Sequence, residues 1–136
     1  MTSHMFRKGF TLIELIIVIA IIGTLTTMFI PRYIELRGNA EESARDGVAG
    51  AVSSGIAIYH GKQITTDSFP VWPSVLDSAP NGVCTLCFSD VLDQPIDDPR
   101  WSKVGYEYTY TMSTNTSITF TYDPATGQLL PSVNNS

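Results

Sequence analysis

The sequence predicts an α+β protein in which one long N-terminal helix packs on a small antiparallel sheet of about three strands. Two patterns predict this fold. Apolar residues fill the start of the chain and then recur at steps of three and four, which is typical of a helix. In the last third they alternate with polar residues, which is typical of strands with one buried face. The apolar stripe of the helix and the apolar face of the sheet are natural packing partners.

Residues 10–30 form the most apolar segment of the chain. They carry one charge, Glu14, although charged residues make up 15% of the 136-residue chain. As a helix with a rise of ~1.5 Å per residue they would span about 31 Å, close to the ~30 Å hydrocarbon thickness of a bilayer. We therefore expect a membrane span. The alternative is a buried helix of a soluble protein, but a domain this small could not cover such a helix on every side.

Two features of this segment are unusual for a membrane span. A carboxylate such as Glu14 costs about 2.5–3.5 kcal/mol at the middle of a bilayer, and such residues are usually paired or functional. Gly23 and the threonines that follow it lower helix propensity, and Pro31 removes a backbone donor. We expect a kink or local melting between Gly23 and Pro31. The alternative is a proline that is simply tolerated where the helix leaves the membrane.

The helix is expected to continue as an amphipathic helix to about His60, with Gly61 as its stop signal. Its apolar stripe consists of Ala44, Val48, Ala51, Val52, Gly55, Ile58 and Tyr59. Charged residues lie between these positions, so one face of the helix needs a packing partner.

The strands are expected in the last third of the chain. Alternating residues predict strands at 106–112 and 118–122 and a short third strand at 128–130, joined by turns at 113–116 and 123–127. The aromatic residues of these strands are expected in the core and on the sheet surface. Residues 63–103 hold most of the prolines and little periodicity, and they predict a long ordered loop.

The charge balance narrows the function classes. The formal net charge is −5 with a pI near 4.7. Because nucleic-acid binding needs clustered Lys and Arg, we do not expect a nucleic acid as a partner. The sequence shows no nucleophile–base pair, phosphate loop or histidine cluster, so we do not expect an enzyme. Asn115 begins a glycosylation sequon, a short pattern that alone establishes no modification.

Residues 9–14, with the sequence Gly-Phe-Thr-Leu-Ile-Glu, resemble the prepilin cleavage motif of type IV pilins and type II secretion pseudopilins. The similarity extends over about residues 7–57, where the helix pattern and Pro31 also match. In that family a prepilin peptidase cuts after the glycine, here Gly9, and the new N-terminal residue, here Phe10, is methylated. The leader is removed, whereas the apolar segment stays in the mature chain.

The resemblance implies three parts: residues 1–9 as a leader, residues 10–31 as a transmembrane and filament-core helix, and residues 32–136 as a periplasmic or extracellular globular domain. It also implies that Glu14 pairs with the N-terminal amine of an adjacent subunit during assembly. The alternative is pairing with the amine of its own Phe10. The stretch from Gly23 to Pro31 would lose helicity when subunits pack.

The function implied is that of a structural subunit of a type IV pilus. Such a subunit is inserted in the inner membrane as a single-pass precursor, trimmed, and polymerised into a helical surface filament for adhesion or motility. Its partners would be other copies of itself, the prepilin peptidase, and the pilus assembly platform and motor. Among pilins the chain looks most like the mannose-sensitive haemagglutinin type, through residues 31–34, 57–62 and 122–127. The alternatives are a pseudopilin of a type II secretion system, a minor pilin, or a monomeric membrane-anchored binding module with an uncut N-terminus.

Two further candidate sites follow the helix. Cys84 and Cys87 form a C-x-x-C pair without the βαβ setting of a thioredoxin-like site or a second pair for zinc. In the oxidising compartment of a pilin domain a disulfide is favoured, and an intermolecular or redox role stays open. Most pilins close a much longer loop with their disulfide. Four aspartates are weak candidates for a calcium site: Asp90, Asp93, Asp97 and Asp98. The alternative is a solvated acidic loop. No other cofactor is expected.

Overall fold

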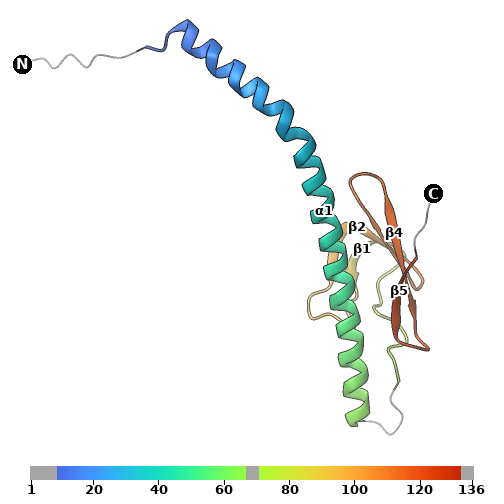
Figure 1. Cartoon of the computed structure of the whole chain (residues 1–136). Coiled ribbons are helices and arrows are strands. Elements are labelled where there is room, and N and C mark those ends of the chain that lie inside the picture. The colour runs from blue at the N-terminus through green and yellow to red at the C-terminus, as the bar shows by residue number, and fades with distance from the viewer. Residues whose placement is uncertain (1–8, 67–70, 133–136) are drawn as a thin grey trace, which may run out of the picture. The chain divides into compact units, whose positions relative to one another are not determined.

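The computed structural model describes residues 9–66 and 71–132 of the chain (Figure 1). Its elements are α1 (Leu12–Thr66), β1 (Gly82–Cys87), β2 (Ile96–Val104), β3 (Glu107–Thr111), β4 (Ser117–Asp123) and β5 (Gln128–Ser132). One long helix followed by an antiparallel sheet confirms the predicted α+β class. The chain divides into two compact units, residues 1–37 and residues 38–136, each treated by itself below.

The helix α1 is 55 residues long and contains Pro31. It does not stop at His60 or Gly61 but continues to Thr66, so the predicted end is wrong. Glycine in a helix lowers stability without forbidding the helix, and Thr65 and Thr66 both donate hydroxyl hydrogen bonds to the carbonyl of Lys62.

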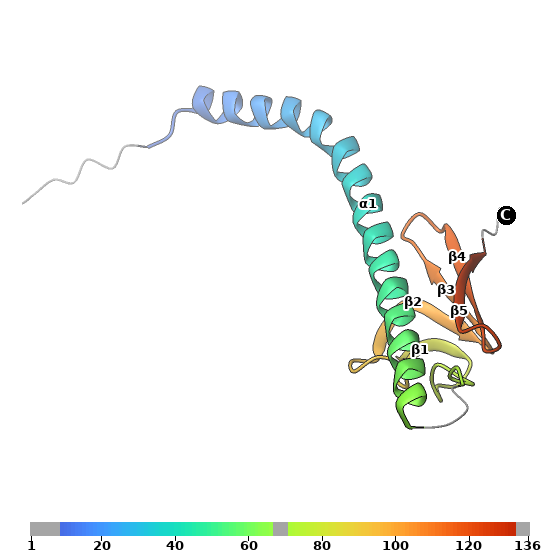
Figure 2. The same cartoon turned by 60° about the horizontal axis from the view of Figure 1, so that its bottom comes forward.

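The sheet is a five-stranded antiparallel meander in the order β1-β2-β3-β4-β5 (Figure 2). The strands β3, β4 and β5 are the three predicted ones, and their register places Tyr110 beside Trp101 on one side and Ile118 on the other. The predicted count of about three strands is too low, because β1 and β2 lie in the stretch predicted as a loop. Register shifts interrupt the alternation of β1, and Pro99 with four charged residues disguises the alternation of β2.

The core lies between the second half of α1 and one face of the sheet. The helix contributes Val52 and Ile56, and the sheet contributes a row of aromatic side chains with at most 5% exposure: Trp101, Tyr108, Tyr110, Phe120 and Tyr122. Gly55 lies where the helix meets the segment between β1 and β2, since a Cβ there would stand 2.1 Å from the carbonyl oxygen of Val91. The glycine therefore allows this close approach.

Candidate functional site

The segment just before α1 has a defined geometry. Gly9 and Phe10 are exposed and outside the helix, and the carbonyl of Thr11 accepts a hydrogen bond from the Leu15 N–H at 3.2 Å. The Glu14 N–H donates to Thr11 Oγ1 at 3.3 Å, and the Thr11 N–H donates to Glu14 Oε2 at 3.5 Å. This reciprocal pair is a capping box, with Thr11 as the N-cap residue. The rest of the predicted leader, residues 1–8, lies outside the described residues.

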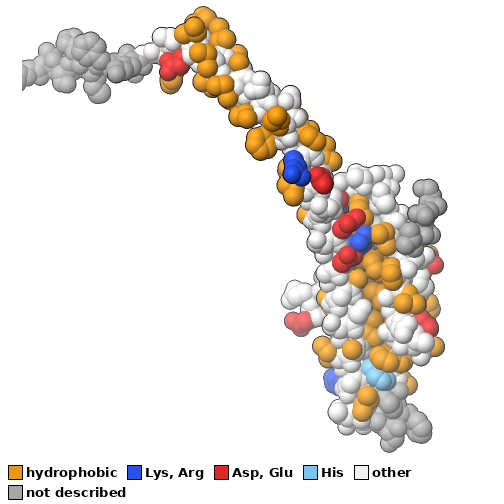
Figure 3. All heavy atoms as spheres, in the orientation of Figure 1, with side chains coloured by type: hydrophobic (Ala, Val, Ile, Leu, Met, Phe, Trp, Pro, Cys, Tyr) orange, Lys and Arg blue, Asp and Glu red, His pale blue; other side chains and the backbone are white. Residues whose placement is uncertain are grey.

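Glu14 is the acidic residue of the first turn, at the start of a helix that is otherwise apolar in this part. Within the described residues, α1 is the helix that is long and apolar enough to cross a membrane by length and composition, with a mean hydropathy of 2.4 over its most apolar window. None of that window is buried. Hydrophobic side chains cover this part of α1 (Figure 3). The roles of Gly9, Phe10 and Glu14 in cleavage, methylation and pairing act between molecules and stay predictions.

The stretch from Gly23 to Pro31 is helical throughout. Three hydroxyls donate to carbonyls of the preceding turn: Thr24 to Ile21 at 2.9 Å, Thr26 to Ile22 at 2.7 Å and Thr27 to Thr24 at 2.8 Å. Since proline has no N–H, the carbonyl four residues before Pro31 lacks its usual helix donor. Melting on assembly stays a prediction, and the cost of breaking this turn is lowered because hydroxyls already serve some of its carbonyls.

One face of the same unit is hollowed. A shallow apolar hollow of about 400 Å³ is lined by Ile22, Leu25, Thr26, Phe29, Ile30 and Tyr33. These residues follow each other at alternating steps of three and one, so they form one stripe of the helix. The hollow is open to the surroundings and suits an apolar medium or another apolar helix.

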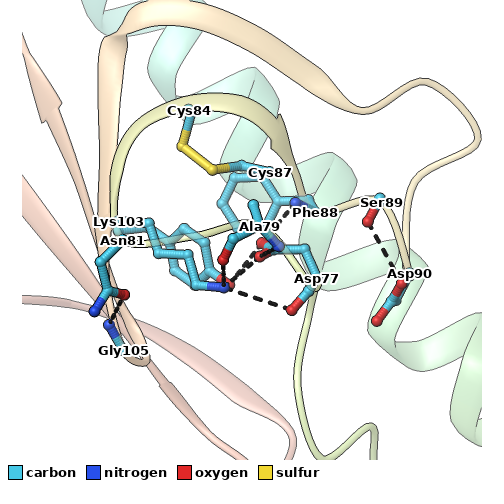
Figure 4. A network of polar contacts seen from close by, with 11 residues as sticks. Asp77, Ala79, Asn81, Cys84, Cys87, Phe88, Ser89, Asp90, Lys103 and Gly105 are labelled. Carbon is cyan, nitrogen blue, oxygen red and sulfur yellow. Dashed lines mark hydrogen bonds and ion pairs between the residues drawn. A yellow bond between two sulfur atoms is a disulfide. The ribbon is translucent and has the colours of Figure 1, made fainter.

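The two cysteines are joined. The Sγ atoms of Cys84 and Cys87 are 2.00 Å apart, and both residues are almost completely buried (Figure 4). Redox-active cysteines are accessible and sit in settings that favour the thiolate, whereas these are covered by the core. The bond therefore closes a short loop at the end of β1 as a structural staple.

A buried ion pair lies beside this staple (Figure 4). The carboxylate of Asp77 pairs with the Lys103 ammonium and accepts the Phe88 N–H and the Tyr108 hydroxyl, each at 2.8 Å. The Ala79 N–H donates to the same carboxylate at 3.0 Å, and Lys103 Nζ donates to the Ala79 carbonyl at 3.0 Å. Four residues, two of them on the strands β2 and β3, thus donate to one carboxylate.

The electrostatics of this cluster follow from its hydrogen bonds. Burial alone would raise the pKa of Asp77, but the donors Lys103, Phe88 and Tyr108 outweigh it, and its pKa lies below the ordinary value. Burial, together with the neighbouring Asp77, raises the pKa of the Tyr108 hydroxyl far above its ordinary value. Asp77 therefore stays ionised and Tyr108 stays a hydrogen-bond donor at neutral pH.

The acidic candidates do not come together. Within residues 9–66 and 71–132, no group of three or more His, Cys, Asp or Glu side chains is placed to hold a metal ion. Asp98 pairs with Arg100 at 2.7 Å, and Asp90 accepts a hydrogen bond from the Ser89 hydroxyl at 3.4 Å. Asp93 and Asp97 remain the other weak candidates. Asn115 lies exposed in the turn between β3 and β4, with a positive φ of 64°.

Comparisons with known proteins match part of the chain. The family model described as "Prokaryotic N-terminal methylation motif" matches residues 5–30. The chain is 50% identical over 54 residues to the "Type IV narrow pilus major component PilA5" of Thermus thermophilus. This match covers 40% of this chain and 47% of that protein. It is 36% identical over 77 residues to "Fimbrial protein EcpC" of Eikenella corrodens, covering 57% and 45%. It is 41% identical over 58 residues to the "Type IV major alpha-pilin" of Moraxella bovis, covering 41% and 36%.

The matches thus span less than half the length of each of these relatives. No solved structure matches the chain.

Proposed function

We propose that the chain belongs to the type IV pilins and is a structural subunit of a type IV pilus, because its N-terminal motif and its partial matches to pilins support this family. The precursor is anchored in the inner membrane, cut after Gly9 and methylated at Phe10. Mature subunits polymerise into a surface filament, with residues 10–31 in its centre and residues 32–136 facing solvent. The finer placement with the mannose-sensitive haemagglutinin type stays a prediction.

One observation carries the proposal: the methylation motif stands at the head of a helix whose apolar surface is entirely uncovered. Fourteen large hydrophobic side chains between Phe10 and Ile30 are about half exposed or more. Burying one such side chain fully is worth about 1.5–3 kcal/mol, so this surface needs an apolar environment. A bilayer supplies it before assembly, and the packed helices of a filament supply it afterwards.

The charges at the helix start give the assembly its register. Cleavage leaves a positive amine on Phe10, four residues before the carboxylate of Glu14. In an apolar medium each charge alone is costly, and the two offset each other when they belong to neighbouring subunits. A subunit shifted along the filament would leave both charges unpaired, which disfavours a wrong register.

Electron microscopy and mass spectrometry of filaments sheared from cells test the proposal. We expect this chain as the main fibre component, beginning at methylated Phe10. A chain confined to the periplasm would indicate a secretion pseudopilin, and a trace amount within fibres of another subunit would indicate a minor pilin. A mature chain that retains residues 1–9 contradicts the proposal and favours a membrane-anchored binding module.

A further inference from the structure

The residues of the cleavage motif also form a helix-start signal. Thr11 is the N-cap residue, Glu14 stands at the third helical position, and each binds the backbone N–H of the other. Phe10 before the cap and Leu15 at the fourth helical position are both apolar, which is the sequence pattern of a hydrophobic staple. The structure forms the capping box, whereas the staple is present as a sequence pattern alone, since Phe10 is 89% exposed.

The capping box places the helix start close to the scissile bond. The helix hydrogen bonds begin with the Leu15 N–H on the Thr11 carbonyl, and α1 begins at Leu12. The peptide bond between Gly9 and Phe10 lies outside the helix, with both residues exposed. If the helix began one turn earlier, the Ile13 N–H would bind the Gly9 carbonyl, because helix bonds join residues four apart.

That carbonyl is the group a peptidase attacks. Hydrolysis adds one water across the Gly9–Phe10 bond, so that Gly9 gains a carboxylate and Phe10 gains the α-amine. A carbonyl engaged in a helix is wrapped by side chains and already has a donor. In an apolar medium an unpaired N–H is costly, which favours extension of the helix toward Gly9 unless a cap satisfies the first turn.

We propose that the capping box of Thr11 and Glu14 holds the start of α1 at Leu12 and thereby presents the Gly9–Phe10 bond to the prepilin peptidase. Thr11 is the positioning residue for cleavage. The inference rests on the proposed function, since it takes cleavage after Gly9 as the processing step. It gives Glu14 two successive partners: the Thr11 N–H in the precursor, and the α-amine of a neighbouring subunit in the filament.

Three variants of the full precursor, in membranes containing the peptidase, separate these two tasks. Thr11→Ala removes the cap, whereas Thr11→Ser keeps it. Glu14→Gln keeps the capping box, because glutamine serves at this position, but removes the charge. We expect Thr11→Ala to be cleaved about fivefold more slowly, with near-native cleavage of the other two. Glu14→Gln should then be cleaved normally and fail to assemble.

Amide hydrogen exchange of the uncut precursor in micelles gives a direct readout of the helix start. Thr11→Ala should increase the protection of the Ile13 amide, because that amide gains the Gly9 carbonyl as acceptor. Native cleavage of Thr11→Ala, an unchanged Ile13 amide, or cleavage of Thr11→Ser as slow as that of Thr11→Ala would each overturn the inference. If the native chain itself is not cut after Gly9, both the proposed function and the capping role are wrong. If the native chain is cut and the variants do not differ, only the capping role falls.

Discussion

The buried carboxylate of Asp77 offers the sharpest test of what holds the globular domain together. In Asp77→Asn the Lys103 ammonium loses its counter-charge, although the Lys103 side chain is only 9% exposed in the folded chain. Breaking a buried pair by removing one partner costs about 3–5 kcal/mol. Because Lys103 keeps the Ala79 carbonyl as an acceptor, we expect a loss near the lower end, about 3 kcal/mol.

Variants of the residues around Asp77 should lower the free energy of unfolding by different amounts. Tyr108→Phe removes one hydrogen bond to the carboxylate and should cost about 1.5–3 kcal/mol. Its matched control is Tyr106→Phe, since Tyr106 is half exposed and its substitution should stay within about 0.5 kcal/mol. The double variant Asp77→Asn with Lys103→Met should recover part of the loss, because it leaves no uncompensated charge in the core.

The same carboxylate gives stability a defined pH dependence. Because the pKa of Asp77 is lower in the folded than in the unfolded chain, its stabilising effect is complete above the ordinary carboxyl pKa of about 4. The effect is lost as pH falls through the lower folded pKa. Asp98 also has a lowered pKa, through its hydrogen bonds to Arg100, so Asp77→Asn should reduce the loss of stability in acid without abolishing it.

Urea unfolding of the full precursor in micelles, followed by the fluorescence of core Trp101, measures these free energies at pH 7 and at pH 3. Two results would refute the reasoning. One is an Asp77→Asn variant as stable as Tyr106→Phe at pH 7. The other is an acid dependence of Asp77→Asn that equals that of the native chain.

Three further predictions concern the same domain. Replacing Cys84 and Cys87 by serine should lower stability by about 2 kcal/mol in the same urea assay, since the bond closes a loop of about four residues. Gly127→Ala should lower the melting temperature more than Gly105→Ala. Both glycines have a positive φ, but a Cβ on Gly127 would lie 2.2 Å from the Trp72 ring, whereas one on Gly105 meets nothing within 4 Å. EDTA should leave the melting temperature unchanged, and a calcium-dependent shift would restore the acidic loop as a metal site.

An element could be predicted from the sequence where its own residues show the apolar periodicity of a strand or a helix. The strand β3 alternates because Tyr108 and Tyr110 face the core while Thr109 faces outward, and the helix shows its stripe in the same way. The strand β1 does not alternate, because its register shifts next to Cys84 and before Cys87, and a periodicity search cannot anticipate a bulge. The strand β2 carries Lys103 toward the core, where the sequence pattern expects an apolar residue.

The N-terminal motif could be predicted from the sequence, whereas the cluster around Asp77 could not. The residues from Gly9 to Glu14 are contiguous, so their spacing alone could indicate their chemistry. The partners of Asp77 come from positions 11, 26 and 31 residues away, and only folding brings them together. A charged residue at a core-facing strand position, as at Lys103, is the signal that could have directed attention there, because a buried ammonium requires a buried acceptor.

The capping box is contiguous in sequence, but its residues have to satisfy two structural requirements. On the proposed function, cleavage would need an extended peptide bond after Gly9, whereas membrane insertion and filament packing would need a helix from the next residues onward. The switch from extended to helical backbone must therefore occur within two or three residues. Threonine at the cap with glutamate three positions later is the side-chain pair that makes such a sharp boundary. If the inference holds, the precursor needs a capping side chain at position 14, where glutamine would also serve, and only assembly needs the charge of Glu14.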